Sequence, residues 1–308
     1  MKNIFGLKDE IAVVTGALGK LGSIWIGALL EAGASVFALD LPGAQVSDDF
    51  KNLQAEFEDS RLTLGRTDVR DRQSLEAVCH DCLQDLGTPS ILVNNAGIDQ
   101  PPADSSGGYR LEDIPLEVNR EIIEVNTLGL FLVTQVFGAQ MVKAGCGSII
   151  NIGSLYASVS PDGHFYDHIK MDPPFLKPPA YGASKAAVIN LTRYLATLWA
   201  PHGVRVNALS PGGVLGSQDE EFKRKFCNRV PLGRMATAED LHGPLLFLAS
   251  QASAYVTGTE LIVDGGFTAW YFDGLKIEDL RNSINFNFII KLTERSDYHH
   301  STFFNRHS

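Results

Sequence analysis

Tyr181 and Lys185 are the pair of residues in this sequence best suited to move a proton. They stand four positions apart in the stretch YGASK, so on a helix both side chains would project from the same face. A free phenol has a pKa of about 10 and holds its proton too tightly for reversible transfer near neutrality. A neighbouring ammonium favours the phenolate and lowers that pKa. The pair therefore suits proton transfer to or from an oxygen atom, and its other interpretation is an incidental surface pair.

Ser154 could complete such a site. It follows an apolar β-strand pattern over residues 148–153, and a hydroxyl at the end of a strand can hydrogen-bond a substrate oxygen. Reduction of a carbonyl by hydride builds negative charge on that oxygen, so a hydrogen-bond donor and a proton donor are needed together. Ser154 and Tyr181 are 27 positions apart (181 − 154), so residues 155–180 must leave the site and return to it.

Residues 155–180 are rich in proline, aspartate, histidine and aromatic residues, and we expect an ordered insertion near the active site. Its prolines would stiffen it, and its polar side chains would lie over the reacting carbon. Two interpretations stay open: selection of a polar, carbohydrate-like substrate, or a subunit contact or decorative loop. His164 and His168 have the spacing of helical metal ligands, but no helix is predicted there and no metal is expected.

A glycine-rich turn near the N-terminus indicates a dinucleotide site. It joins a strand pattern at residues 11–15 to a helical pattern at residues 21–31. Glycines permit positive φ and let a pyrophosphate approach the backbone at a helix N-terminus, although a tight turn without a ligand would also use them. The expected contacts in this turn are Gly16, Gly19, Leu21 and Gly22.

Asp40 favours NAD over NADP. It falls 24 positions after Gly16 (40 − 16), at the end of a strand predicted at residues 35–39. A carboxylate there can accept hydrogen bonds from the adenosine ribose hydroxyls and would repel a 2′-phosphate. The alternative is a solvated loop aspartate. Lys20 is evidence in the other direction, because a cation in the glycine turn could bind the 2′-phosphate of NADP.

The rest of the chain alternates between strand and helix patterns. Strands are predicted at residues 62–68, 91–94, 148–153, 205–209 and 260–263, and helices at 72–86, 117–144, 183–200 and 237–248. This alternation predicts an α/β fold, a Rossmann-type doubly wound parallel sheet in three α/β/α layers. Residues 1–270 are expected to form a single domain, and residues 271–308 a peripheral or partly disordered C-terminal extension.

Composition narrows the choice of partners and compartment. The 308 residues are 44% hydrophobic and carry a net charge of −10, which disfavours a nucleic-acid partner because phosphates are bound by Lys and Arg. No run of about 20 apolar residues and no signal-peptide core is apparent, so no membrane partner and a cytoplasmic location are expected. The four cysteines form no disulfide framework and are expected to be buried thiols.

These motifs together resemble the short-chain dehydrogenase/reductase (SDR) family, in its single-domain branch, over about residues 7–270. The resemblance is carried by Thr15 to Gly22, Asp68, Asn94 to Gly97, Asn126, Ser154, the YGASK stretch, Pro211-Gly212 and Val263 to Gly266. It implies that Asp68 and Val69 flank the adenine and that Asn126 holds a water in a proton relay. It further implies that the cofactor cleft is lined by Asn95, Ala96, Gly97, Tyr181, Lys185, Pro211, Gly212 and Val214.

The sequence departs from the family pattern in the glycine turn and in two segments. Lys20 stands where single-domain members usually carry glycine, and the Gly16, Gly19, Gly22 spacing is similar to that of the sugar-nucleotide-modifying branch. Residues 213–234 resemble the family's mobile substrate lid. A narrower resemblance, to oxidoreductases of flagellin-glycosylation and nonulosonic-acid pathways, is carried by the insertion at residues 155–180 together with Pro211 to Val214, Asp219 to Phe222 and Gly266 to Trp270.

The resemblance implies an NAD-dependent oxidoreductase that moves a hydride between nicotinamide and a carbonyl or alcohol carbon of a polar small molecule, such as a sugar or sugar nucleotide. An enzymatic alternative is a 3-oxoacyl-thioester reductase acting on acyl carrier protein with NADPH, which predicts a basic patch. An alternative of another class is a non-catalytic dinucleotide sensor or scaffold. A homotetramer assembled through the helices around Asn126 and Tyr181 is also expected from the resemblance.

Overall fold

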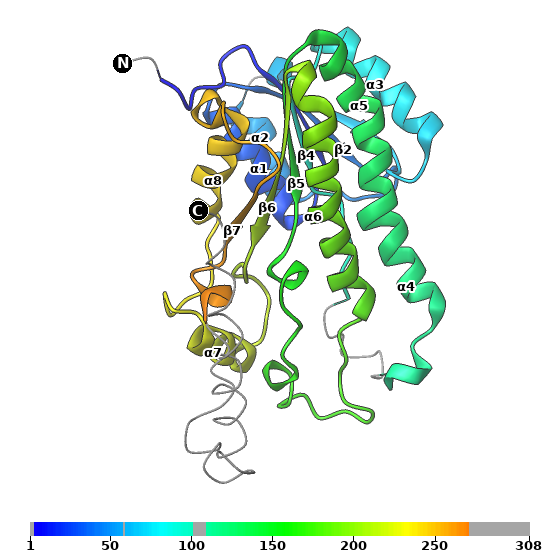
Figure 1. Ribbon diagram of the computed structural model, residues 1–308, viewed down its shortest axis with the longest axis vertical. Helices are drawn as coiled ribbons and strands as arrows, with labels where there is room; N and C mark the ends of the chain where they lie inside the picture. The colour runs from blue at the N-terminus through cyan, green and yellow to red at the C-terminus, as the bar shows by residue number, and fades with distance from the viewer. Residues whose placement is uncertain (1–2, 58, 101–108, 271–308) are drawn as a thin grey trace, which may run out of the picture. The chain divides into compact units, whose positions relative to one another are not determined.

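Parallel β-strands form the centre of the fold (Figure 1). In the described part of the chain they make one seven-stranded sheet in the order β3-β2-β1-β4-β5-β6-β7, and every pairing is parallel. The predicted Rossmann-type sheet is confirmed. The strands are β1 (Ile11–Thr15), β2 (Ser35–Asp40), β3 (Leu62–Arg66), β4 (Ile91–Asn94), β5 (Gly147–Ile152), β6 (Val204–Pro211) and β7 (Glu260–Val263).

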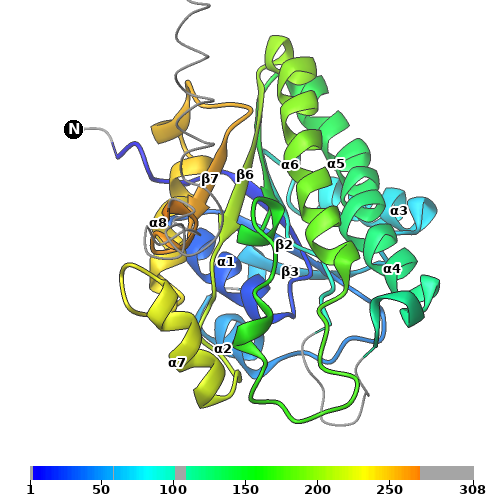
Figure 2. The same ribbon diagram turned by 60° about the horizontal axis from the view of Figure 1, so that its bottom comes forward.

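Helices cover both faces of this sheet, which gives the predicted three layers (Figures 1 and 2). One face carries α1, α2 and α8, and the other carries α3, α4, α5 and α6. The helices are α1 (Lys20–Glu31), α2 (Asp48–Glu56), α3 (Arg72–Asp85), α4 (Leu116–Ile123), α5 (Leu130–Ala144), α6 (Pro179–Trp199), α7 (Glu220–Arg229) and α8 (Glu239–Ala249).

The strands form two hydrophobic cores because successive side chains point to opposite faces of the sheet. In β1, Ala12 and Val14 pack into the core beneath α1 and α8, whereas Val13 packs into the core beneath α3, α5 and α6. A strand buried on both faces is apolar at every position, which is why these segments read as continuous hydrophobic runs.

The structure describes residues 3–57, 59–100 and 109–270. One compact unit spans Met1–Thr268, and Ala269–Ser308 are assigned to a second. The C-terminal extension expected at residues 271–308 lies outside the described residues. Cys79 and Cys82 are buried as expected, and burial raises the pKa of their thiols to about 11 and about 12. The expectation is wrong for Cys146, which is exposed, and Cys227 is only partly buried.

The long helix predicted at residues 117–144 is divided. A π-helical turn, Glu124–Gly129, separates α4 from α5, and such turns are rare and often occur at functional sites. By length and composition alone Leu116–Ala144 could cross a membrane, but half of its most apolar stretch is buried. Its core-facing residues Val133, Phe137 and Met141 pack against the sheet, so packing in the fold accounts for the apolar sequence.

Candidate active site

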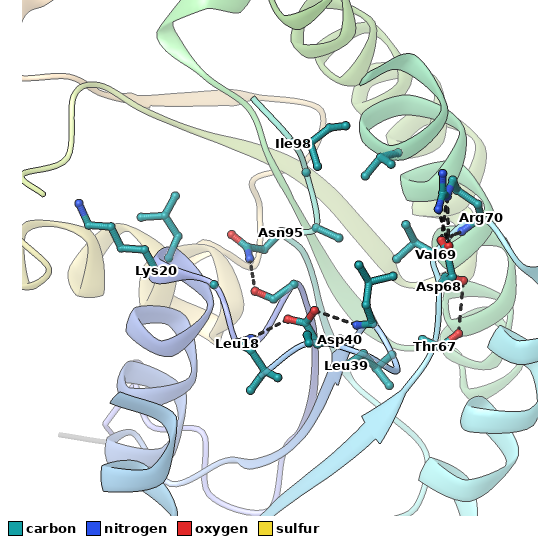
Figure 3. A pocket seen from close by; sticks show the side chains of 18 of the residues that line it. Leu18, Lys20, Leu39, Asp40, Thr67, Asp68, Val69, Arg70, Asn95 and Ile98 are labelled. Atoms are coloured by element: carbon teal, nitrogen blue, oxygen red, sulfur yellow. Dashed lines mark hydrogen bonds and ion pairs between the residues drawn. The ribbon is translucent and has the colours of Figure 1, made fainter. Parts of the chain in front are cut away.

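A cleft opens at the carboxyl ends of β1, β2 and β4 (Figure 3). The strand order reverses between β1 and β4, and crevices at such switch points are the usual ligand sites of open α/β sheets. The cavity is about 580 Å³. The predicted cofactor residues that line it are Gly16, Gly19, Leu21, Asp40, Asp68, Val69, Asn95, Ala96 and Gly97.

Two glycines shape the turn at the base of this cleft. Gly16 has φ of +63°, and a Cβ there would lie 2.8 Å from Cα of Ala96. Gly22 lies within α1, where a Cβ would come 2.3 Å from the carbonyl oxygen of Gly16. Gly22 therefore does not line the cavity but lets the helix pack against the turn, which leaves the helix N-terminus open to an anion.

Asp40 lines the cleft at the end of β2 (Figure 3). Its Oδ2 accepts a hydrogen bond of 2.8 Å from the backbone N–H of Leu18, and its Oδ1 accepts one of 2.8 Å from the N–H of Leu41. The carboxylate is thus fixed by the glycine turn on one side and by the end of β2 on the other. The preference for NAD over NADP was predicted from a carboxylate at the end of this strand, and it stays a prediction.

Lys20 reaches across the turn to the segment that begins the predicted lid. Its ammonium donates to the carbonyl oxygen of Val214 at 3.2 Å and also to that of Leu215. Val214 is therefore joined to the cleft through Lys20 and is not among its lining residues. Pro211 ends β6, and Gly212 lines a separate cavity of about 130 Å³ near Asp264.

Tyr181, Ser154 and Lys185 come together as predicted, from the first turns of α6 and the end of β5. Ser154 is close enough to the Tyr181 phenol to act on it as a hydrogen-bonding neighbour that lowers its pKa, and Oγ of Ser154 accepts from the N–H of Tyr156 at 3.2 Å. The Lys185 ammonium donates to the carbonyl oxygen of Ile152 at 2.8 Å and lies 5.9 Å from the centroid of the Tyr181 ring. One residue that follows β5 and two residues of α6 thus make a single cluster.

The pKa of Tyr181 corrects one expectation. Loss of solvation raises it above its usual range, with a further upward push from the Asp99 carboxylate, and the Ser154 hydrogen bond opposes this only partly. Burial also lowers the pKa of Lys185 to about 8. The lysine beside the phenol therefore does not by itself produce an acidic tyrosine in this protein, because removing both groups from water acts against the charged form of each.

Asn126 is buried in the π-helical turn, and its amide is held by protein groups. Its Oδ1 accepts from the N–H of Ile98 at 2.8 Å, and its Nδ2 donates to the carbonyl of Ile98 at 3.0 Å and to Oγ of Ser184 at 3.1 Å. A Cβ on Gly97 would lie 3.2 Å from Asn126 Oδ1. The amide thus joins the loop after β4 to α6, and a water held by Asn126 stays a prediction.

Comparison with known proteins places these features in a family. A family model described as enoyl-(acyl carrier protein) reductase matches residues 25–268. The crystal structure of a short-chain dehydrogenase from Leptospira borgpetersenii with bound NAD⁺ is 33% identical, with a TM-score of 0.75, over 87% of this chain and 96% of that one. This chain belongs to the short-chain dehydrogenase/reductase family. The SDR is accordingly a nicotinamide-dependent oxidoreductase that acts on an alcohol or carbonyl group of a polar small molecule.

Two further relatives of this SDR are informative. An NAD-dependent glycerol dehydrogenase from Listeria innocua is 32% identical over 273 residues, covering 86% of this chain and 96% of that protein. A gluconate 5-dehydrogenase from Burkholderia cenocepacia, solved with NADP and tartrate, is 29% identical with a TM-score of 0.74, over 87% and 99% of the two chains. These relatives support the family and not the narrower resemblance to nonulosonic-acid enzymes.

The insertion and α7 of this SDR form an aromatic cluster. The ring of Phe165 lies 5.9 Å from that of Phe222 and 5.5 Å from that of Phe226, and Phe226 stacks on Phe267 at 5.1 Å. These rings bury the apolar side of α7. The predicted insertion and the predicted lid are therefore packed together.

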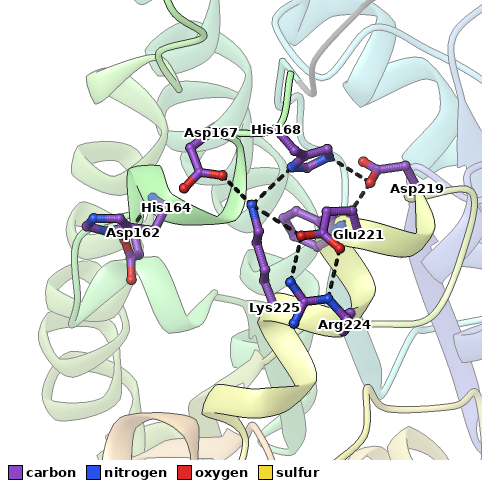
Figure 4. A network of polar contacts seen from close by, with 9 residues as sticks. Asp162, His164, Asp167, His168, Asp219, Glu221, Arg224 and Lys225 are labelled. Carbon is purple, nitrogen blue, oxygen red and sulfur yellow. Dashed lines mark hydrogen bonds and ion pairs between the residues drawn. The ribbon is translucent and has the colours of Figure 1, made fainter. Parts of the chain in front are cut away.

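Polar contacts join the same two segments on their outer side (Figure 4). The Lys225 ammonium pairs with Asp167, and Nε2 of His168 lies 2.7 Å from Oδ1 of Asp219. His164 instead contacts Asp162 within the insertion, at 2.7 Å. The two histidines thus serve different carboxylates, and among the described residues no group of three potential ligands gathers around them.

Two residues that the structure places at the cleft and beside Tyr181 were given no site role from the sequence. Thr15 ends β1, and its hydroxyl accepts from the N–H groups of Asn95 at 3.1 Å and Ala96 at 3.0 Å, which fixes the cleft wall. A polar residue at the end of an apolar strand was the available signal. Lys177, in the insertion, lies against the ring of Tyr181. No local pattern marks it, because the contact depends on how the insertion folds back.

Proposed function

We propose that this SDR is an NAD-dependent dehydrogenase that oxidises a secondary hydroxyl of a polyol or sugar acid and, in reverse, reduces the corresponding ketone. The observation that carries this proposal is the cluster of Tyr181, Ser154 and Lys185 at the strand ends, beside a dinucleotide-sized cleft with Asp40 fixed inside it. The glycerol and gluconate dehydrogenases among its relatives support the substrate class.

The proposed chemistry separates a hydride from a proton. Gly16, Gly19 and Asp40 would hold NAD in the cleft, where it would supply the hydride acceptor. Ser154 donates a hydrogen bond to the substrate oxygen, and Tyr181 takes the hydroxyl proton as hydride leaves the carbon. Because desolvation raises the pKa of Tyr181, the positive charge of Lys185 is needed to favour the phenolate, and its pKa of about 8 leaves it mostly protonated near neutrality.

We assign Asn126 a positioning role in this reaction. Its three hydrogen bonds hold the loop after β4 against α6, so the cofactor cleft and Tyr181 keep a fixed separation. The π-helical turn around it leaves backbone groups out of the regular i to i−4 pattern, which provides a place for the relay water implied by the family resemblance.

NAD is the proposed cofactor, and a cytoplasmic homotetramer the proposed state. Asp40 supports the preference for NAD, while relatives solved with NAD⁺ and with NADP support the cofactor class alone. Exposed apolar residues on the outer side of the α4–α6 layer, Leu128, Tyr194 and Leu198, support assembly through these helices. Sedimentation that gives only monomer would remove the tetramer from the proposal.

The first test is a fluorescence titration with NADH and, separately, NADPH, followed by rate measurements with NAD and a panel of polyols and sugar acids. Tighter NADH binding and turnover of such alcohols are the expected results. Tighter NADPH binding would favour the 3-oxoacyl-thioester reductase, to which the acyl-carrier description of the matching family model also points. Binding of neither nucleotide would overturn the proposal, and binding without turnover of any alcohol or ketone would favour a sensor.

A further inference from the structure

Lys177 places a second buried ammonium beside Tyr181. Its side chain is 8% exposed, and Nζ lies 2.7 Å from Oδ2 of Asp99, in the loop after β4. The same Nζ lies 5.2 Å from the ring centroid of Tyr181 and 5.2 Å from that of Tyr156. Lysine is seldom buried without a partner for its charge, and Asp99 is that partner here. The pair does not explain why the ammonium lies against the ring of the reacting tyrosine.

The charges around Tyr181 do not balance. Lys177 and Lys185 each contribute one positive charge, and Asp99 is the carboxylate whose field acts on both Tyr181 and Lys185. The cluster is therefore left with one net positive charge, inside a chain whose net charge is −10. Uncompensated charge is costly to keep away from water, and an anionic group of a ligand would offset that cost.

The Lys177 ammonium has more N–H donors than the described residues supply acceptors for. It carries three N–H groups, and Asp99 is its one hydrogen-bond acceptor among the residues that the structure describes. Its contacts with the rings of Tyr156 and Tyr181 are cation–π contacts, which are not hydrogen bonds from its N–H groups. Tyr156 packs edge-on against Tyr181, with ring centroids 6.4 Å apart, and Tyr166 packs on Phe175 at 4.7 Å, so packed aromatic residues surround the ammonium.

We propose that Lys177 determines substrate specificity by binding a carboxylate close to the carbon that reacts at Tyr181, so that sugar acids are preferred to neutral polyols of the same length. The inference rests on the proposed function, because Tyr181 is taken to mark the reacting carbon. Asp99 holds the ammonium in place, and one-third of its own side chain is exposed, so it can accept from substrate hydroxyls next to the carboxylate.

A purely structural role for the pair makes a different prediction. The ion pair joins the insertion to the loop after β4, and it could do no more than hold these segments together. Loss of Lys177 would then impair all substrates equally through a displaced insertion. Recognition of a carboxylate instead predicts a loss confined mainly to anionic substrates.

The test uses substrate pairs that differ at one end only. Initial rates of NAD reduction are measured with gluconate and other six-carbon aldonates, each compared with its matched alditol. The variants are Lys177→Met, Lys177→Arg and, as a matched control, Lys170→Met, which removes an exposed lysine from the same insertion. We expect the Met variant to lower the aldonate-to-alditol ratio of kcat/KM by about tenfold or more, mainly through KM, with partial rescue by Arg and no change of ratio in the control.

A second measurement needs no turnover. Binding of tartrate to the enzyme–NADH complex is followed by fluorescence in the parent and in Lys177→Met, with NADH affinity and melting temperature as controls for folding. Loss of tartrate binding in the variant supports the inference. Equal tartrate binding in both proteins, or an unchanged aldonate-to-alditol ratio, overturns the inference about Lys177. If NADH binding and alditol oxidation persist, the proposed function itself is unaffected. Failure to bind NADH would overturn the proposed function itself.

Discussion

The cofactor half and the substrate half of this SDR are built in different ways. Around the dinucleotide cleft, backbone groups and glycines do most of the positioning, as Gly16, Gly22 and the Asp40-to-Leu18 hydrogen bond illustrate. Around the reacting carbon, side chains from segments far apart in the sequence meet, as in the contact of Lys177 with Tyr181 and the packing of Phe165 on Phe226. Local sequence motifs therefore specify the cofactor half, whereas the substrate half depends on contacts between distant segments.

Substitutions in the two halves should therefore have different effects. A change in the cofactor half should alter nucleotide binding for every substrate, because all substrates share the nucleotide. A change among the contacts between insertion and α7 should alter substrate recognition and leave the nucleotide in place. The residues that touch both halves, above all Tyr181 and Lys185, should affect the chemical step.

Tyr181→Phe is expected to have the largest effect. Loss of the phenolic hydroxyl should lower kcat by about 10²- to 10⁴-fold, the usual contribution of a general acid–base group, with NADH affinity retained. Tyr194→Phe, at an exposed position on the same helix, is the matched control. Steady-state rates and NADH titration measure both quantities. Undiminished turnover would mean that another group transfers the proton.

Gly22→Ala is expected to damage the cofactor half alone. The added Cβ would meet the Gly16 carbonyl at 2.3 Å, so the backbone must shift, and we expect a loss of about 1–3 kcal/mol in stability with weaker NADH binding. Gly43→Ala is the control, because nothing lies within 4 Å of its added Cβ. Urea denaturation and NADH titration provide the measurements. Equal behaviour of the two variants would contradict the close packing of α1 on the turn.

Lys185 should make stability depend on pH. Burial lowers its pKa from the ordinary value of 10.5 to about 8 in the folded chain. Between those values the unfolded chain binds more protons than the folded one, so the free energy of unfolding should rise with pH, by an amount on the order of 1–3 kcal/mol. Urea denaturation of the cofactor-free protein at pH 7 to 10, relative to Lys185→Met, measures this. If the difference in unfolding free energy between the parent and Lys185→Met does not change with pH, the Lys185 ammonium is solvated in the folded protein.

Asp40→Asn should change nucleotide choice and little else. Removing the charge while keeping one oxygen acceptor is expected to raise the affinity for NADPH relative to NADH by roughly tenfold. The comparison variant is Asp48→Asn, which removes an exposed charge in α2. Titrations with both nucleotides are compared across the three proteins. If the ratio stays constant, nucleotide choice is set elsewhere in the cleft.

Lys225→Met should have the smallest effect. Its ion pair with Asp167 joins α7 to the insertion, and its second pair, with Glu221, lies within α7. Both carboxylates are partly exposed, and such pairs contribute about 0–1 kcal/mol. We expect KM for the sugar substrate to rise by less than about fivefold, with NADH affinity unchanged. Lys223→Met is the control, because Lys223 pairs with Glu220 within α7 itself. A weaker affinity for NADH in Lys225→Met would break the separation between the two halves.

Where the sequence misled, non-local contacts were responsible. The predicted helix at residues 117–144 follows from an apolar pattern that continues through the π-helical turn at Asn126. Within that turn, Asn126 hydrogen-bonds Ile98, in the loop after β4, and Ser184, in α6. These partners are far from Asn126 in the sequence, so the apolar pattern of the helix does not reveal the turn. Likewise, Lys185 should acidify Tyr181 as a pair in water, but the fold removes both groups from water and raises the pKa of the phenol.

The sequence by itself determined the parallel sheet, the glycine turn, the place of Asp40 and the grouping of Ser154, Tyr181 and Lys185. Each of these follows from local periodicity or from the rule that parallel strands end at one edge of the sheet. Only the tertiary structure decided that the insertion packs on α7 and that Lys177 and Asp99 meet beside Tyr181. Those contacts join residues far apart in the chain, and their energies depend on burial and packing that no short stretch of sequence specifies.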